Sequence, residues 1–480
     1  MPFNYYDIVT ALTVGILALS VLFFITKNAK ALFILTILSV PFSSEIVVEL
    51  PIQGLELPTL FFPTDFLAGI IAAFILFAIP LVAGHGKERL GLRHSRIFLV
   101  WALYFLWMFI TTLLSGSFIV SIKFFLLQIA YALTYGGLGY YFLQGNPGEM
   151  KSVYGRYMLV SLVATLFVCV VEHVLLGAGR EVTNRAIAPF FREHTVYGGF
   201  TAWMFLAYFL LWRASQLSLG LLVALGFSAV ALFLSYSRGG WLSAMGALVM
   251  VPVAQWLWRL PRSRALAALA GSGLLAIGGL SFLLSSQGQM WLDDKLSDIL
   301  GDTGKRIASS FDTQRDLSNI GRIHRWIVAW ELFKQDPLTG IGPNTYAEEY
   351  HAYKRASQLL GVIKKLDLAY AGIHSEYLTA LTEMGIVGIL LLVVLYGMTL
   401  YYPLAYAFSA GGKQTRLIGL LVAVPLLSYY LHAFINNFMD HGKVAALIYL
   451  HWGAAMALEV QMRKQKQSIQ KYGMASQEVV

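Results

Sequence analysis

The stretch GIHSEYLTALTEMGIVGILLLVVLYG, residues 372–397, places a polar His-Ser-Glu triplet directly before a long apolar run. A run of about 20 apolar residues is long enough to cross the hydrocarbon core of a bilayer as a helix. The chain as a whole has this character, because 58% of its 480 residues are hydrophobic and only 13% are charged. Soluble domains carry about 25% charged residues. Such a chain cannot cover itself with polar surface, so we predict a protein embedded in lipid.

Similar apolar runs recur along the chain and predict about thirteen membrane-spanning helices. They lie near residues 7–26, 30–45, 63–84, 97–115, 119–143, 157–177, 195–212, 217–236, 239–258, 265–285, 379–404, 416–437 and 443–460. The predicted fold class is therefore an all-α polytopic membrane protein with about 12–13 transmembrane helices. The single cysteine, Cys169, excludes an intramolecular disulfide. The opening residues MPFNYYDIVT lack the basic segment of a cleavable signal peptide.

The distribution of basic residues orients the predicted helices. The C-terminal segment 463–480 begins with RKQKQ and is expected in the cytoplasm, where basic loops accumulate. Counting back through thirteen spans makes the cytoplasmic loops basic and puts the N-terminus outside. Two outer segments break this pattern: the loop 179–194, which holds Arg180, Arg185 and Arg192, and the large loop 286–376. Basic residues on the outer side favour an anionic ligand at that face.

A phosphate or diphosphate is the natural candidate for that ligand, because guanidinium groups bind it through paired hydrogen bonds. The alternative is that these side chains anchor to lipid phosphates or are simply solvated. For a single arginine the sequence leaves both readings open.

Two short motifs on the outer side carry candidate site residues. SYSRGGW, residues 235–241, places Arg238 between two spans, and the Gly-Gly pair after it permits a close backbone approach. His374 immediately precedes the span 379–404. Either motif could also be an interfacial side chain at a helix end.

The stretch 321–350 predicts an amphipathic helix followed by a break. Apolar residues at 323, 326, 327, 330 and 333 recur at helical spacing, and DPLTGIGPN then ends the helix. We expect this helix to lie against the outer membrane face and to offer Arg322 and Arg325.

Taken in order, these motifs resemble the O-antigen ligase superfamily of polytopic membrane glycosyltransferases. The resemblance rests on an Arg-x-x-x-Leu motif, a His-x(10)-Gly motif and a Gly-Arg…Trp…Pro-Leu-x-Gly-x-Gly pattern around a large outer loop. They read here as Arg238–Leu242, His374–Gly385 and Gly321, Arg322, Trp326, Pro337, Leu338, Gly340 and Gly342. The usual His-Asn pair is His374-Ser375, and the upstream arginine motif has His194-Thr195 in place of Pro-Asn.

The resemblance implies a GT-C-like enzyme of the bacterial inner membrane that moves a glycan from undecaprenyl diphosphate to an acceptor hydroxyl at the periplasmic face. Besides membrane lipids, its partners would be the lipid-linked donor and an acceptor that is a glycan or lipid A–core. No nucleic acid, cofactor or metal is expected. A ligase is favoured narrowly over a polymerase of O-antigen or exopolysaccharide repeats. A transporter or flippase is disfavoured because the chain shows no internal repeat, and a non-catalytic assembly scaffold is a third possibility.

Catalysis in such an enzyme needs a base and a stabiliser of the leaving group. Histidine suits the first role because its ordinary pKa is about 6.5, and arginine suits the second. The predicted catalytic residues are His374, Arg238 and Arg322. The predicted substrate-binding residues are Arg185, Arg192, Arg325, Glu376 and Tyr346.

Three of the acidic and aromatic residues keep alternatives. Glu376 could orient His374 or simply favour a helix N-terminus. Glu383 is costly inside an apolar helix unless it is paired, and Arg322 is its candidate partner. Tyr346 could stack on a sugar or belong to an interfacial aromatic belt.

The expected organisation has five parts. These are N-terminal transmembrane helices (1–177), central helices with the Arg-rich loop and the Arg238 motif (178–285), a large periplasmic loop with amphipathic helices (286–376), C-terminal transmembrane helices (377–462) and a basic cytoplasmic tail (463–480).

Overall fold

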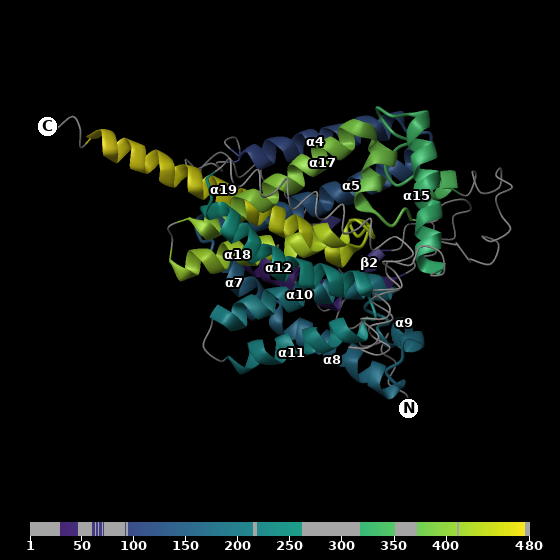
Figure 1. Cartoon of the computed structure of the whole chain (residues 1–480), viewed down its shortest axis with the longest axis horizontal. Coiled ribbons are helices and arrows are strands. Elements are labelled where there is room, and N and C mark those ends of the chain that lie inside the picture. The colour runs from purple at the N-terminus through teal and green to yellow at the C-terminus, as the bar shows by residue number, and fades with distance from the viewer. Residues whose placement is uncertain are drawn as a thin grey trace.

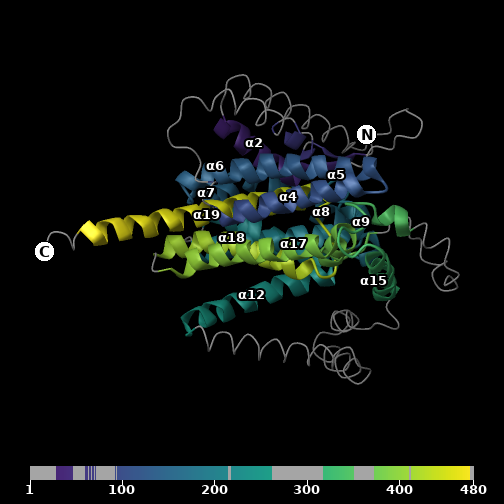
Figure 2. The same ribbon diagram turned by 90° about the horizontal axis from the view of Figure 1, so that it is seen from above.

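The computed structural model describes residues 29–46, parts of 60–71, residue 92, and residues 95–214, 218–261, 317–350, 372–409 and 412–475. These residues form a bundle of long helices that share one axis, which is horizontal in Figures 1 and 2. The predicted spans 7–26 and 265–285, most of 63–84 and much of the loop 286–376 lie outside the described residues.

The helices follow the apolar runs. Their bounds are α2 (Ala29–Phe42), α4 (Arg96–Leu114), α5 (Phe118–Tyr131), α6 (Leu138–Gly145), α7 (Glu149–Ser152), α8 (Leu159–Leu175), α9 (Thr183–Ala186), α10 (His194–Ala214), α11 (Leu219–Leu234), α12 (Arg238–Arg259), α15 (Leu317–Gln335), α17 (Glu376–Phe408), α18 (Lys413–His432) and α19 (Gly442–Ala475). Two π-helical turns, Ala132–Gly137 and Val153–Tyr157, and a 3-10 turn, Arg180–Val182, interrupt or precede them. A two-stranded ribbon pairs β1 (Ser44–Ile46) antiparallel with β2 (Leu60–Phe62).

Within the described residues, seven helical segments are long and apolar enough to cross a membrane, or eight if the bent pair Glu149–Tyr157 and Leu159–Leu175 is one span. Two shorter apolar helices, Lys30–Phe42 and Leu219–Leu234, coincide with two further predicted spans. Helices satisfy their own backbone hydrogen bonds, which is why they can cross lipid. The prediction of an all-α polytopic membrane protein is confirmed.

Helix α19 lies at the centre of the bundle. It packs against α6 and α17, and 94% of its apolar 18-residue stretch is buried. It continues to Ala475 and projects beyond the other helices (Figure 1), so the segment predicted as a tail from residue 463 is largely helical. The reason is local: Lys, Gln and Arg are good helix formers, and Arg463 contacts Glu459 one turn earlier at 2.8 Å.

Helix α17 is broken at Gly385, where φ is +66°. The segment after α15 fills the break: the amides of Ile341 and Gly342 donate to the carbonyls of Thr382 and Glu383 at 3.1 and 3.0 Å. The amide of Ile386 donates back to the Pro337 carbonyl at 2.9 Å. The segment Pro337–Gly342 and the break in α17 at Gly385 are therefore joined by backbone hydrogen bonds. We call this contact the joint.

This joint sets the position of α15, which lies across the end of the bundle in both views (Figures 1 and 2). Val328, Ala329 and Leu332 of α15 are buried, whereas Ile327 and Trp330 are 55% and 49% exposed. The predicted apolar stripe therefore points partly away from the bundle. That this face lies against the membrane stays a prediction.

We predict that Gly385→Ala destabilises the protein by at least about 2 kcal/mol, because an alanine is strained at this φ. A Cβ at this position would also lie 2.1 Å from the Leu338 carbonyl oxygen. Thermal unfolding in detergent micelles measures the loss. Gly397→Ala is the matched control in the same helix, since an added Cβ there meets nothing within 4 Å. Equal unfolding temperatures for the two variants would contradict this account of the joint.

Candidate functional site

Arg238 is the first residue of α12, and its charge acts on His194 together with that of Arg322 in α15. Ser237 caps the helix by accepting a hydrogen bond from the Gly240 amide at 3.2 Å. An added Cβ on Gly240 would lie 2.8 Å from the Gly198 carbonyl oxygen, so α10 and α12 meet almost backbone to backbone. The Gly-Gly pair after Arg238 is needed for this close approach.

The start of α12 also contacts a histidine of α18 through Gly239, the first glycine of that pair. An added Cβ on Gly239 would lie 2.6 Å from Nε2 of His432, so the start of α12 packs directly on the end of α18. Nε2 of His432 accepts a hydrogen bond from Nδ2 of Asn436 at 2.8 Å. Oδ1 of Asn436 accepts one from Nδ1 of His374 at 3.3 Å. Thus Asn436 bridges two histidines.

The bridge determines the tautomer of His374. An amide oxygen can only accept, so Nδ1 of His374 carries the proton and Nε2 keeps its lone pair. The backbone of His374 has φ +56°, an uncommon conformation for a non-glycine residue, and its neighbour Ile373 is held by a hydrogen bond from Trp326 Nε1 at 3.1 Å. The hydrogen bond with Asn436 therefore orients the ring, and the hydrogen bond from Trp326 holds the backbone next to it.

The charge state of His374 follows from its surroundings. Burial, followed by the positive charges of Arg325 and Arg322, lowers the pKa of His374 to about 3. An ordinary histidine has a pKa of about 6.5. His374 is therefore neutral at pH 7, with Nε2 ready to accept a proton.

The two arginines come from one face of α15. Arg322 and Arg325 are one turn apart and half-buried. Nε of Arg325 is buried and has no hydrogen-bond partner among the described residues. Burial lowers the pKa of Arg325, but a guanidinium stays charged at pH 7. The charge of Arg322 also acts on His432.

The upstream loop adds Arg180, which the sequence analysis grouped with Arg185 and Arg192 but did not name as a binding residue. The charges of Arg180, Arg322 and Arg238 act together on His194, which opens α10. Tyr236, two residues before Arg238, donates its hydroxyl to the Ala178 carbonyl at 2.6 Å and so holds this loop.

Arg185 in α9 and Arg192 before α10 are exposed, as is Arg180. The arginine charges that act on His194 and His374 are those of Arg180, Arg238, Arg322 and Arg325. The roles of Arg185 and Arg192 as substrate-binding residues stay predictions.

Glu376 holds the loop that carries Asn436. It is buried, and its Oε2 accepts hydrogen bonds from the Phe438 amide at 3.0 Å and the Tyr429 hydroxyl at 3.1 Å. Its own amide donates to the Ala433 carbonyl at 2.9 Å. These contacts are those of a positioning residue, and its predicted contact with substrate stays a prediction.

Glu383 and Tyr346 position α15. The carboxylate of Glu383 accepts hydrogen bonds from the amides of Asn344 at 2.7 Å and Tyr346 at 3.2 Å, so the expected pairing with Arg322 is replaced by backbone amides. Tyr346 is 2% exposed and donates its hydroxyl to the Arg325 carbonyl at 2.8 Å. Such burial argues against direct stacking of Tyr346 on a sugar.

Sequence reasoning did not name His432 or Asn436 as site residues; both lie at the end of the predicted span 416–437. Their spacing of four residues at the end of an apolar span was the available signal. Among the described residues, no group of three or more His, Cys, Asp or Glu side chains could hold a metal ion. The assembled site joins a neutral imidazole to several guanidinium groups, which suits proton abstraction beside an anion.

Comparison with known protein families adds one match. Residues 221–393 match a family model described as O-antigen ligase. This range begins in α11 and ends in α17, so it includes Arg238, Arg322 and His374. No curated protein matches the chain.

We predict that Glu383→Gln loosens α15, because a glutamine offers one acceptor oxygen where the carboxylate satisfies two amides. Hydrogen exchange at the amides of Asn344 and Tyr346 should accelerate by about tenfold or more, as expected for a lost hydrogen bond to a charged group. The control is Glu331→Gln, which removes only an exposed ion pair with Lys334 on the same helix. Unchanged exchange in the Glu383 variant would refute its role in the joint.

Proposed function

From the match of residues 221–393 to the O-antigen ligase family, we propose that the chain is a membrane glycosyltransferase of this superfamily that transfers a glycan from undecaprenyl diphosphate to an acceptor hydroxyl. We place the reaction at the periplasmic face of the inner membrane, on the side of the bundle that holds His374 and the arginines of α15. The C-terminus would then lie in the cytoplasm. The five-part organisation predicted from the sequence, with α19 extended through its last part, fits this orientation.

The observation that carries the proposal is the neutral His374, held with Nε2 unprotonated beside the charges of Arg322 and Arg325. A base and an anion site are the two parts that this reaction needs. Basic residues alone would fit lipid anchoring equally well, but lipid anchoring does not require an oriented neutral histidine.

In the proposed reaction, the acceptor oxygen attacks the anomeric carbon of the donor. Its proton passes to Nε2 of His374 as the new carbon–oxygen bond forms. The bond from the anomeric carbon to the diphosphate oxygen breaks, and its electron pair leaves with undecaprenyl diphosphate. Direct displacement of this kind inverts the anomeric centre.

The arginines stabilise the departing diphosphate. Arg322 and Arg325 reach it from α15, Arg238 from the start of α12, and Arg180 from the upstream loop. One well-placed group that stabilises developing charge lowers the activation free energy by about 3–4 kcal/mol. Arg185 and Arg192 would contact the donor further from the reacting atoms.

Asn436 acts as a positioning residue. When Nε2 of His374 takes the proton, Nδ1 still donates to Oδ1 of Asn436, so the ring keeps its orientation through the step. His432 holds the other end of the Asn436 amide. Glu376 fixes the loop that carries this amide.

The acceptor decides between a ligase and a polymerase. We favour a ligase that uses a lipid A–core acceptor, since the motifs around Arg238 and His374 follow the ligase pattern. A polymerase that uses a second lipid-linked repeat shares the same donor chemistry and is the alternative.

We predict that His374→Ala and Arg322→Ala each reduce glycan transfer by at least about 100-fold, as expected for loss of a base or a charge stabiliser. Complementation of a deletion strain at matched expression tests this, on gels that resolve lipid-linked repeats, lipid-linked polymer and lipid A–linked glycan. Lys334→Ala is the control, because Lys334 lies at the exposed end of the same helix.

The accumulating species separates the candidates. Full-length polymer on undecaprenyl diphosphate identifies a ligase, and single repeats identify a polymerase. Wild-type glycan patterns from both site variants would reject the mechanism.

We predict that Arg325→Gln moves the acid limb of the kcat/KM profile for the donor to higher pH. A base is active at every pH above its pKa, so wild-type His374 stays active in the free enzyme far below pH 6.5. Removing the Arg325 charge removes one cause of the low pKa, so the pKa of His374 rises. Profiles from about pH 8 to about pH 2.5, which include the wild-type limb, measure this shift against Lys334→Gln. A limb that stays in place or moves to lower pH would contradict the assignment.

A further inference from the structure

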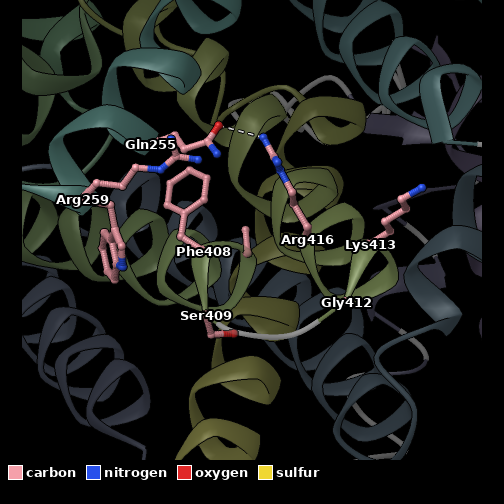
Figure 3. A pocket seen from close by; sticks show the side chains of 9 residues that line it. Gln255, Arg259, Phe408, Ser409, Gly412, Lys413 and Arg416 are labelled. Atoms are coloured by element: carbon pink, nitrogen blue, oxygen red, sulfur yellow. Dashed lines mark hydrogen bonds between the residues drawn. The ribbon is translucent and has the colours of Figure 1, made fainter.

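At the end of the bundle opposite the candidate site, a cavity of about 310 Å³ lies between the ends of α12 and α17 and the start of α18. Figure 3 shows Gln255 and Arg259 of α12 facing Arg416 of α18 across the ring of Phe408. The cavity is formed by residues far from those used in the proposed reaction.

The cavity is positively charged. Arg259, Lys413 and Arg416 line it, and none of its described lining residues is acidic. Arg416 is held in place because its Nη2 donates to Oε1 of Gln255 at 2.7 Å. The first turn of α18 adds backbone N–H groups, since its N-cap, Gly412, has no capping side chain. Cations and helix amides together favour a phosphate group.

The surroundings of the cavity are those of a membrane interface. Trp258 lies beside Tyr401 and Phe408, with ring centroids 5.7 and 5.9 Å away, and both Trp258 and Tyr401 are more than two-fifths exposed. Aromatic side chains of this kind concentrate at the headgroup level of a bilayer. Only 22% of the apolar 18-residue stretch of α12 is buried, as judged from the described residues. Lipid can therefore reach the cavity along this helix.

We propose that this cavity binds the phosphate headgroup of an anionic phospholipid. Arg259 and Arg416 would contact the phosphate from two helices, with Lys413 beside them, while the acyl chains lie along the exposed face of α12. A free phosphate ion shares the headgroup chemistry but would gain nothing from the aromatic and apolar border. The proposal does not depend on the proposed glycosyl transfer.

Native mass spectrometry of the full-length protein in detergent tests the site, with phosphatidylglycerol and phosphatidylcholine as probes. We expect saturable binding of phosphatidylglycerol that is stronger than that of phosphatidylcholine. The double variant Arg259→Gln/Arg416→Gln should weaken it by about tenfold, as expected for two interfacial basic residues. Inorganic phosphate, compared with chloride at equal ionic strength, should not displace the lipid.

The matched control is Lys464→Gln/Lys466→Gln, which removes two charges from the exposed extension of α19. Its affinity for phosphatidylglycerol should change by less than about twofold. Ser409→Asp gives a second variant, since it adds a carboxylate at the exposed rim without removing an existing cation. It should weaken binding as well. Equal losses in the control, equal binding of both lipids, or displacement by inorganic phosphate would overturn the proposal.

Discussion

The break in α17 at Gly385 is the constraint on which the site depends. A helix interrupted inside a bilayer leaves backbone groups without partners, which is costly in lipid. Here the segment Pro337–Gly342 supplies those partners through three backbone hydrogen bonds. Trp107 of α4 donates its indole N–H to the Met384 carbonyl at 2.8 Å and closes the joint from the other side. Because α15 precedes this segment, the same hydrogen bonds place Arg322 and Arg325.

Buried carboxylates in this bundle bind backbone amides. Glu383 accepts from two amides of the segment after α15, and Glu376 from the amide of Phe438. Glu459 of α19 accepts from the amides of Arg96 and Ile97 and so caps α4. A carboxylate used in this way satisfies orphan helix and loop donors while losing its water. These acidic residues therefore hold the helices and loops that surround the site.

The two ends of the bundle are both basic but differ in construction. At the end crossed by α15, arginines are half-buried beside oriented histidines, so desolvation strengthens their effect on nearby groups. At the other end, Arg259 and Arg416 are exposed and border an apolar helix face. The first arrangement suits chemistry on a bound anion, and the second suits a lipid headgroup.

Sequence alone determined the fold class and the order of the motifs. Hydropathy and helical periodicity are local properties, so the apolar runs predicted α4, α10, α12 and α17 to within a few residues, and the motifs around Arg238 and His374 marked one face. Hydropathy marked only the apolar part of α19, and the helix continues through the exposed charged segment to Ala475.

Only the tertiary structure decided which side chains meet. His374 and Asn436 are 62 residues apart, and their contact depends on how α17 and α18 pack. The same holds for Glu383, whose partners proved to be amides brought in by the break at Gly385, and for the loop before Arg180, where the Tyr236 hydroxyl donates to the Ala178 carbonyl. Residue type states what a side chain can do, whereas packing between distant helices determines which groups are close enough for it to act on.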